Sequence, residues 1–292
     1  MNLLLSVLEQ GLIYAILALG VYITFKILDF PDMTVDSSFP LGAAVTALMI
    51  QSGFSPLLTL PAAIAVGALA GAVTGFIHVR LHVGGLLSGI IVMTGLYSVN
   101  LHIAGRANVQ LFSFDTMFKN GFIASLPASL QLYAPVVILA LLTLVVKLLM
   151  DAYLATRSGF LLRATGDNPT LVSTLAQDSG KVKILGLSIA NALVALSGCI
   201  MCQYQRYFDI SMGTGTLVLA VASVIVGTQL LRGLRCLRTT TAVVLGSILY
   251  KGCVALALSF GLSPFDLKLV TAALLLLIIV LGGGKRKVKR HA

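Results

Sequence analysis

Only a few ionisable residues, which interrupt long apolar runs, give this chain a means of doing chemistry. Lys251 stands inside the apolar run Thr239–Phe260, and three carboxylates follow the first apolar run: Asp29, Asp32 and Asp36. A lysine within a membrane helix costs about 2.5–3.5 kcal/mol on insertion scales, so its side chain should face the protein interior or a cavity. Either a structural ion pair or a place on a solute path would satisfy it. Its candidate partners are Glu9, Asp209 and Asp266.

No catalytic motif accompanies these charges. The chain lacks a G-x-x-x-x-G-K-[ST] phosphate loop, an H-E-x-x-H helix and a G-x-S-x-G elbow. His78 and His82 have metal-ligand spacing, but they flank Arg80 and no carboxylate accompanies them. Cys199 and Cys202 form a C-x-x-C inside an apolar helix, where small packing residues are expected. We therefore predict no catalytic residue, no metal site and no cofactor held by this chain.

Composition sets the class of protein. Apolar residues make up 58% of the 292 residues and charged residues only 10%, with a mean hydropathy of +1.01. Such a chain cannot cover a soluble surface, so we predict an all-α, polytopic helical membrane protein. The formal net charge of +10 comes mainly from residues at the ends of apolar runs. These residues set membrane topology, and we predict a lipid bilayer and no nucleic acid as partners.

About eight or nine membrane segments are expected in a single domain, residues 1–292. The segments are about Leu5–Leu28, Pro40–Gln51, Leu57–His78, Gly85–Ile103, Leu132–Met150, Ile184–Tyr204, Thr214–Leu231, Thr239–Phe260 and Leu267–Leu281. Two of them, Pro40–Gln51 and Thr214–Leu231, are short and follow polar stretches with glycine or proline, which indicates broken or re-entrant helices.

The two short segments also suggest an internal repeat. The stretch from Leu28 to Asp36 precedes one of them, and the stretch from Tyr207 to Gly215 precedes the other. The order of segments would make the repeats inverted, with a first repeat at about 5–150 and a second at about 184–283. A solute path is expected at the interface of such repeats. Our candidate path residues are Asp32, Asp36, Ser37, Ser38, Asn100, Gly213, Thr214, Gly215 and Lys251.

Basic residues predict the orientation. Strict alternation places three basic groups on one side: the loop at about 151–183, the loop holding Arg232, Arg235 and Arg238, and the tail 284–292. The positive-inside rule makes that side cytoplasmic, so the C-terminus is expected in the cytoplasm and the N-terminus outside.

A polar interruption in the 151–183 loop predicts a short amphipathic helix over residues 169–178. Asp167 or Asn168 suits the N-cap, Pro169 the first helical position and Gly180 the residue that ends the helix. One apolar face is expected, made of Leu171, Val172, Leu175 and Ala176. A membrane protein does not need such a helix to stay folded, whereas docking a soluble partner would require one.

The loop from Thr156 to Pro169, running on to Ala176 and Gly180, resembles the cytoplasmic loop of bacterial ABC importer permeases of the branched-chain amino acid and ribose type. The stretch from Met212 to Gly227 resembles the second broken segment of that family. The opening Gln10–Ala15, together with Leu28–Asp36, is similar to a narrower branch linked to external binding proteins for amino acids such as tryptophan or tyrosine.

The resemblance implies a transport subunit without its own ATPase, in the bacterial cytoplasmic (inner) membrane. It implies two copies of an ABC ATPase that binds ATP and Mg, a second permease copy forming a homodimer, and an external solute-binding protein. It assigns ATPase coupling to Arg163, Ala164, Gly166, Asn168, Ala176 and Gly180. The alternative is a secondary transporter driven by an ion gradient through Lys251 and the Asp29, Asp32 and Asp36 cluster.

A test of the docking helix follows from its apolar face. Replacing Leu171 or Leu175 with Asp should abolish co-purification of the ATPase, because a carboxylate cannot enter an apolar contact. Membrane insertion should be unchanged. Stoichiometric co-purification of either variant would contradict the docking role.

Overall fold

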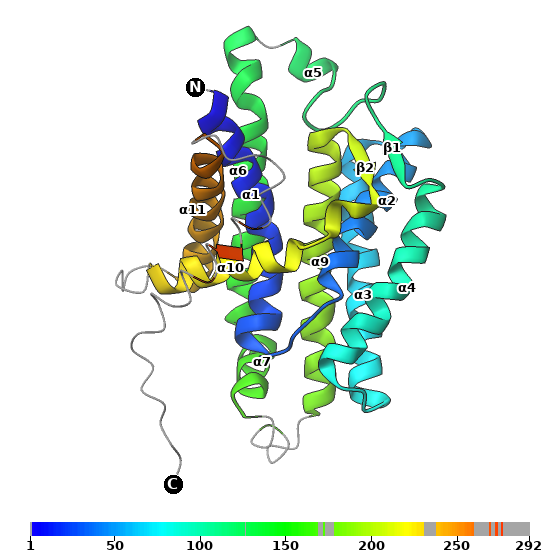
Figure 1. The fold of residues 1–292 in the computed structure, drawn as a ribbon, viewed down its shortest axis with the longest axis vertical. Helices are drawn as coiled ribbons and strands as arrows, with labels where there is room; N and C mark the ends of the chain where they lie inside the picture. The colour runs from blue at the N-terminus through cyan, green and yellow to red at the C-terminus, as the bar shows by residue number, and fades with distance from the viewer. Residues whose placement is uncertain are drawn as a thin grey trace.

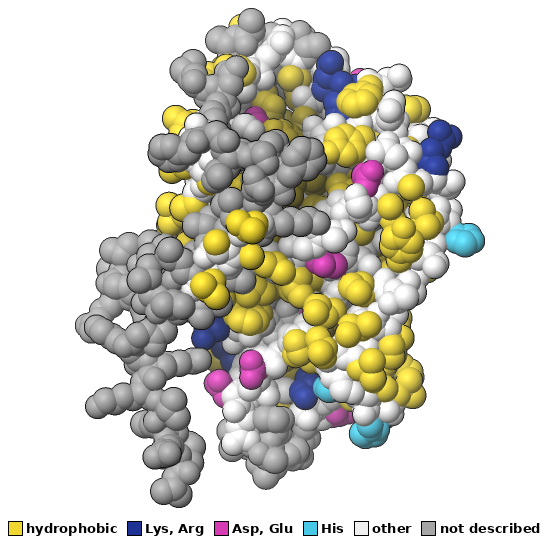
Figure 2. Space-filling view, viewed as in Figure 1, with side chains coloured by type: hydrophobic (Ala, Val, Ile, Leu, Met, Phe, Trp, Pro, Cys, Tyr) yellow, Lys and Arg dark blue, Asp and Glu magenta, His cyan; other side chains and the backbone are white. Residues whose placement is uncertain are grey.

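The computed structural model describes residues 2–125, 127–168, 172, 178–230 and 238–259, with isolated positions at 269, 272, 273 and 276. Over this part of the chain it is a bundle of long helices (Figure 1). Seven of the described helices are long and apolar enough to cross a membrane. Hydrophobic side chains spread over the viewed face, with Lys and Arg toward its upper and lower parts (Figure 2). The predicted class, a polytopic helical membrane protein, is confirmed.

The described elements run in chain order as follows: α1 (Asn2–Val21), η1 (Tyr22–Ile27), α2 (Val35–Gln51), η2 (Pro56–Leu58), α3 (Thr59–Arg80), α4 (Gly85–Ala104), β1 (Asn108–Gln110), α5 (Gly121–Ala124), α6 (Ala128–Leu154), α7 (Arg157–Asp167), α9 (Ser179–Gln205), β2 (Tyr207–Asp209), η3 (Ile210–Gly213), α10 (Thr216–Leu230) and α11 (Thr239–Ser259). Every segment predicted before residue 260 contains a helix. The last predicted segment, Leu267–Leu281, lies outside the continuously described residues.

Helix α9 is the centre of the bundle, and small residues let its neighbours approach closely. A Cβ atom built on Gly71 of α3 would lie 2.1 Å from the carbonyl oxygen of Leu187. The same atom on Gly42 of α2 would lie 1.9 Å from the carbonyl oxygen of Ala195. Gly67, Gly71 and Gly75 thus form a glycine ridge on α3 that packs directly on α9. Close packing of this kind replaces the hydrophobic driving force that lipid cannot supply.

A two-stranded antiparallel sheet joins the two halves of the chain at one end of the bundle (Figure 1). Val109 of β1 pairs with Phe208 of β2, and both are buried. Arg206, in the left-handed region with φ of 61°, ends α9, and its guanidinium lies over the Phe112 ring at 5.7 Å. The loop from 105 to 131 thus packs onto the end of α9. The N-terminus lies at this same end, and α7 lies at the opposite end.

The two predicted breaks are present. Helix α1 widens into the π-helix η1, and an irregular segment then leads to α2, which begins well inside the bundle (Figure 1). Helix α10 lies across the bundle rather than along it. Two features depart from the sequence prediction: η1 was not expected, and the 151–168 stretch, predicted as loop, contains α7.

Alanine substitution tests the close contact of α3 with α9. Gly71→Ala should lower the unfolding free energy by about 1–3 kcal/mol, because the new methyl group overlaps a backbone carbonyl. The matched control is Gly95→Ala in α4, where a Cβ meets nothing within 4 Å and helix propensity should give a gain of about 0.5–1 kcal/mol. Loss of helical circular dichroism on heating in detergent measures both. Equal melting temperatures for the two variants would contradict the contact.

Candidate translocation and coupling site

The carboxylate of Asp36 holds the two broken regions together. It lies in the first turn of α2 and accepts hydrogen bonds from the backbone N–H groups of Gly215, at 3.1 Å, and Leu217, at 2.8 Å. The Thr216 hydroxyl donates a third at 3.1 Å. Asp36 is thus an N-cap for α10 supplied by a residue 180 positions away. Two helix N-termini meet here, and the negative charge stabilises both positive ends.

A second carboxylate fixes the segment before α2. Asp32 is 1% exposed, and its Oδ1 accepts the Thr34 N–H at 3.0 Å. Its Oδ2 accepts the Asn191 side-chain amide of α9 at 2.8 Å. The Thr34 hydroxyl shares a 2.9 Å hydrogen bond with Thr74 of α3. Non-helical backbone at membrane depth is stable only where protein satisfies its polar groups, and these bonds do so.

The first turn of α2 is also tied to α4. The Ser37 hydroxyl donates to the Met93 carbonyl at 2.8 Å, and the Asn100 amide donates to the Ser37 carbonyl at 3.0 Å. Three buried oxygens in this region accept no hydrogen bond from any described residue: Ser38 Oγ, Asn100 Oδ1 and Asn191 Oδ1. Buried oxygens of this kind are costly unless water or a solute reaches them.

The second break is built on glycine. A Cβ on Gly213 would lie 2.0 Å from the Asp36 carbonyl oxygen, and Gly215 has a φ of 85° that side chains rarely adopt. Thr214, between them, is exposed. The structure therefore brings Gly213, Thr214 and Gly215 to the Asp36 turn.

Asp209 shapes the entry to this second break from the sheet side. It caps η3 by accepting the Ser211 N–H at 2.8 Å, and the Asn108 amide of β1 donates to it at 3.1 Å. The side-chain hydrogen bond from Ser211 is the main cause that lowers the pKa of the Asp209 carboxyl group. Asp209 is therefore engaged with the sheet end of the bundle, and it forms no described ion pair with Lys251.

Lys251 is not part of the Asp36 region. Its Nζ lies 4.0 Å from the Tyr14 ring centroid and 3.5 Å from Gln10 Oε1, both on α1. Of its expected partners, Glu9 instead accepts the Tyr204 hydroxyl at 2.7 Å, and Asp266 lies outside the described residues.

Helix α7 lies at the end of the bundle that carries the predicted coupling loop, and it contacts the first break directly. A Cβ on Gly166 would lie 1.7 Å from the Ile27 carbonyl oxygen, the last residue of η1. Leu162 of α7 is fully buried, and its side chain meets Gly186 of α9 beside Leu28. One short helix therefore touches both the segment that precedes α2 and the central helix α9.

The predicted coupling residues divide between two regions. Arg163, Gly166 and Asp167 belong to α7, and Asn168 ends that helix as its C-cap. Val172 is buried. Pro169, Leu171, Leu175 and Ala176 lie outside the described residues. Gly180 was predicted to end the coupling helix, and this is wrong: it lies in the first turn of α9, because Asp178 caps that helix through the N–H groups of Gly180 and Lys181.

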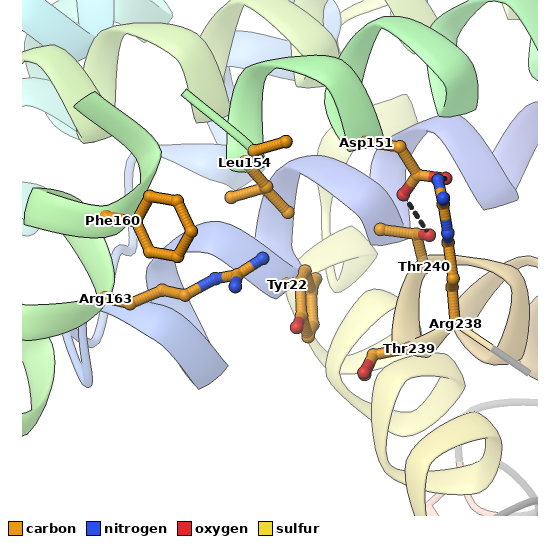
Figure 3. Close-up of a pocket in the computed structure, with 9 residues that line it drawn as sticks. Tyr22, Asp151, Leu154, Phe160, Arg163, Arg238, Thr239 and Thr240 are labelled. Atoms are coloured by element: carbon orange, nitrogen blue, oxygen red, sulfur yellow. Dashed lines mark hydrogen bonds and ion pairs between the residues drawn. The ribbon is translucent and has the colours of Figure 1, made fainter. Parts of the chain in front are cut away.

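A cavity of about 370 Å³ opens beside α7 (Figure 3). Tyr22, Phe160 and Arg163 line one side, with the Arg163 guanidinium 6.0 Å from the Phe160 ring. On the other side, Asp151 of α6 accepts the Thr240 hydroxyl at 2.5 Å and pairs with Arg238 at 3.2 Å. Asp151 thereby ties the end of α6 to the start of α11.

Across the described residues, no group of three or more His, Cys, Asp or Glu could hold a metal ion.

Sequence reasoning missed several members of this site. Asn191, Thr34 and Thr74 hold the break together, and Leu162 joins α7 to α9. Asn191 carried a usable signal, because an amide inside an apolar helix needs a polar partner. Leu162 carried none, since leucine is common in every helix of the chain.

A polytopic helical membrane bundle agrees with what this chain is similar to among known proteins. The family model described as "Branched-chain amino acid transport system / permease component" matches residues 3–280. The chain belongs to this family of permease components of ABC-type transporters. Subunits of this kind are transport components rather than enzymes.

Among individual relatives, the tyrosine transport system permease protein of Clostridioides difficile is 44% identical over 269 residues, covering 92% of this chain and 88% of the relative. The ribose import permease protein RbsC of Escherichia coli K12 is 26% identical over 232 residues, covering 80% and 71%. Among solved structures, PsaBC from Streptococcus pneumoniae in complex with Fab has a TM-score of 0.53 at 14% identity, covering 99% of this chain and 93% of that one. This last likeness concerns the fold alone.

Removing the Asp36 cap should loosen the joint between the two breaks. Asp36→Ala should cost about 1–3 kcal/mol, since it leaves two backbone N–H groups of α10 without their acceptor. Asp36→Asn, which keeps one oxygen acceptor, should cost less. Thermal unfolding and hydrogen exchange of residues 215–220 measure the effect. Unchanged exchange in Asp36→Ala would show that α10 does not depend on this carboxylate.

Proposed function

We propose that the chain is the transmembrane permease subunit of an ATP-binding-cassette importer that moves a small solute inward by alternating access. A separate ATPase would supply the energy. The observation that carries this proposal is the contact of α7 with both the first break and α9, through Gly166 on the Ile27 carbonyl and Leu162 on Gly186. Force from a cytoplasmic ATPase can reach the broken segment only through an element that contacts it. Helix α7 makes that contact.

The transmission would run in three steps. Closure of two ATPases moves the 169–178 segment and, with it, α7. Because Gly166 touches the backbone at Ile27, the motion reaches the segment that leads into α2. The Asp36 carboxylate then carries it to α10, so both breaks move together. Helices that move as units, together with these coupled breaks, alternately open a path to either side.

The solute path in this proposal follows the polar turn at the start of α2 and the Gly213–Gly215 break. The three buried oxygens of Ser38, Asn100 and Asn191 support it, because a passing solute or water supplies the donors that they lack among described residues. The meeting of the α2 and α10 N-termini also supports two inverted repeats, at about 5–150 and 184–283, joined by the 151–183 loop.

The membrane orientation follows from charge. Arg157, Arg163, Lys181 and Lys183 lie at the α7 end, so we assign that end, and the C-terminal tail, to the cytoplasm. The β1–β2 end would face outward and receive solute from an external binding protein. A bacterial inner membrane, a homodimer of this chain and two ATPase copies complete the proposed assembly.

The substrate class we propose is an amino acid, with an aromatic one first. It rests on the 44% identity with a tyrosine transport system permease protein across nearly the whole chain. The ion-driven alternative receives less support, because Lys251 contacts Gln10 and Tyr14 and forms no described ion pair with Asp29, Asp32 or Asp36.

Reconstitution tests the energy source. Proteoliposomes holding the permease and its ATPase, supplied with the binding protein, should take up labelled tyrosine only when ATP is present on the ATPase side. A protonophore should leave uptake unchanged. Uptake that collapses with the protonophore and persists without ATP would select the ion-driven transporter instead.

A single methyl group tests the transmission route. Gly166→Ala should reduce uptake by about tenfold or more while the ATPase still co-purifies, because the added Cβ displaces α7 from Ile27, and a tenfold loss needs only about 1.4 kcal/mol. Gly84→Ala is the matched control, since a Cβ there meets nothing within 4 Å. Wild-type uptake in Gly166→Ala would rule out this contact as the route.

A further inference from the structure

Lys251 is a cation inside the bundle with no described counter-ion. The described ion pairs join Lys147 and Arg238 to Asp151, and Lys181 to Asp178. Lys251 has instead a neutral amide oxygen at 3.5 Å and the face of the Tyr14 ring at 4.0 Å. A cation–π contact compensates only part of the cost of removing an ammonium group from water. An anion placed here would supply the counter-charge that the described residues do not.

A carboxylate lies on the same helix as these two contacts. Glu9 precedes Gln10 and is 9% exposed, and its Oε2 accepts the Tyr204 hydroxyl at 2.7 Å. That bond holds the Glu9 side chain in place. α1 thus carries a fixed negative group at Glu9, one residue before the Gln10 that contacts Lys251 of α11.

Aromatic rings connect this place to the first break. The Tyr14 ring stacks on Phe39, with centroids 6.2 Å apart and planes 6° apart. Phe39 lies one helical turn beyond Asp36 on α2. The Tyr204 ring packs edge-to-face on Phe118 at 5.9 Å. Tyr14 and Lys251 are both partly exposed.

We propose that the Lys251 cluster, made of Glu9, Gln10, Tyr14, Tyr204 and Lys251, recognises a zwitterionic α-amino acid that carries an aromatic ring. The carboxylate of the solute pairs with the Lys251 ammonium, its ammonium group turns toward Glu9, and its ring packs on the partly exposed Tyr14 ring, which Phe39 supports from behind. The inference rests on the proposed import function and adds a site within the permease itself, separate from the external binding protein.

The site is tested in the reconstituted permease–ATPase complex with its binding protein. Lys251→Met removes the charge and keeps an apolar side chain suited to a membrane helix, and uptake of labelled L-tyrosine should fall about tenfold, as expected for loss of one charge-assisted hydrogen bond. Lys251→Arg should stay within about threefold of wild type. Stimulation of ATP hydrolysis by loaded binding protein should persist in both, and Arg80→Met, at the exposed end of α3, is the control.

Direct binding gives a second readout. The permease–ATPase complex in nanodiscs, without binding protein, should bind labelled L-tyrosine by scintillation proximity. Unlabelled 3-(4-hydroxyphenyl)propionate, which keeps the carboxylate, should compete in wild type and lose its effect in Lys251→Met. Tyramine, which lacks the carboxylate, should compete equally in both proteins, because its ammonium group addresses Glu9 alone.

The outcomes separate this inference from the import proposal. Wild-type uptake by Lys251→Met, or competition by the propionate that the substitution does not change, would overturn the Lys251 site and leave ATP-driven import standing. An equal loss in Asp266→Asn would assign Lys251 to a structural ion pair and overturn the site as well. Absence of ATP-dependent uptake in the wild-type complex would overturn the import proposal and this inference with it.

Discussion

One carboxylate makes the arrangement of this membrane bundle possible. Two helix N-termini, those of α2 and α10, meet inside the protein, where their partial positive charges repel and their first N–H groups need acceptors. Asp36 lies in the first turn of α2, where its charge favours both positive ends, and it accepts the Gly215 and Leu217 N–H groups and the Thr216 hydroxyl at the start of α10. A negative group here therefore stabilises the meeting of the two helix starts, on which our account of transport depends.

Close backbone contact is the second constraint. Lipid offers no hydrophobic advantage to helix association, so surface area alone does not hold this bundle together. Glycines on α2, α3 and α7 bring neighbouring backbones so near that a methyl group would overlap a carbonyl, as at Gly42, Gly71 and Gly166. Close glycine contacts have two roles here. Gly71 fixes α3 to α9, and Gly166 places α7 against the end of η1.

The sequence predicted the helical membrane class, the segments before residue 260 and the positions of both breaks. These rest on long apolar runs and on Pro, Gly and Asp residues whose physics is local. It did not predict that Asp36 caps α10, because a contact between residues 180 positions apart leaves no local pattern. It also assigned Gly180 as the residue that ends the coupling helix, since a glycine after an amphipathic stretch is typical of a helix end, whereas Asp178 caps α9 there and Gly180 lies in its first turn. The cost of a lysine in lipid identified Lys251 as an interior residue. The sequence did not predict that Gln10 and Tyr14 would be its contacts.

The π-helical turn η1 gives α1 a property that an ordinary α-helix of the same length lacks. A π-turn holds one residue more than an α-turn, so Tyr22–Ile27 carries surplus backbone at the junction between a straight helix and an irregular segment. If η1 became regular α-helix, the segment after it would rotate about the α1 axis by about 100°, which is the rotation per residue at 3.6 residues per turn. The extra residue in η1 therefore sets the direction in which the chain leaves α1 for the irregular segment before α2.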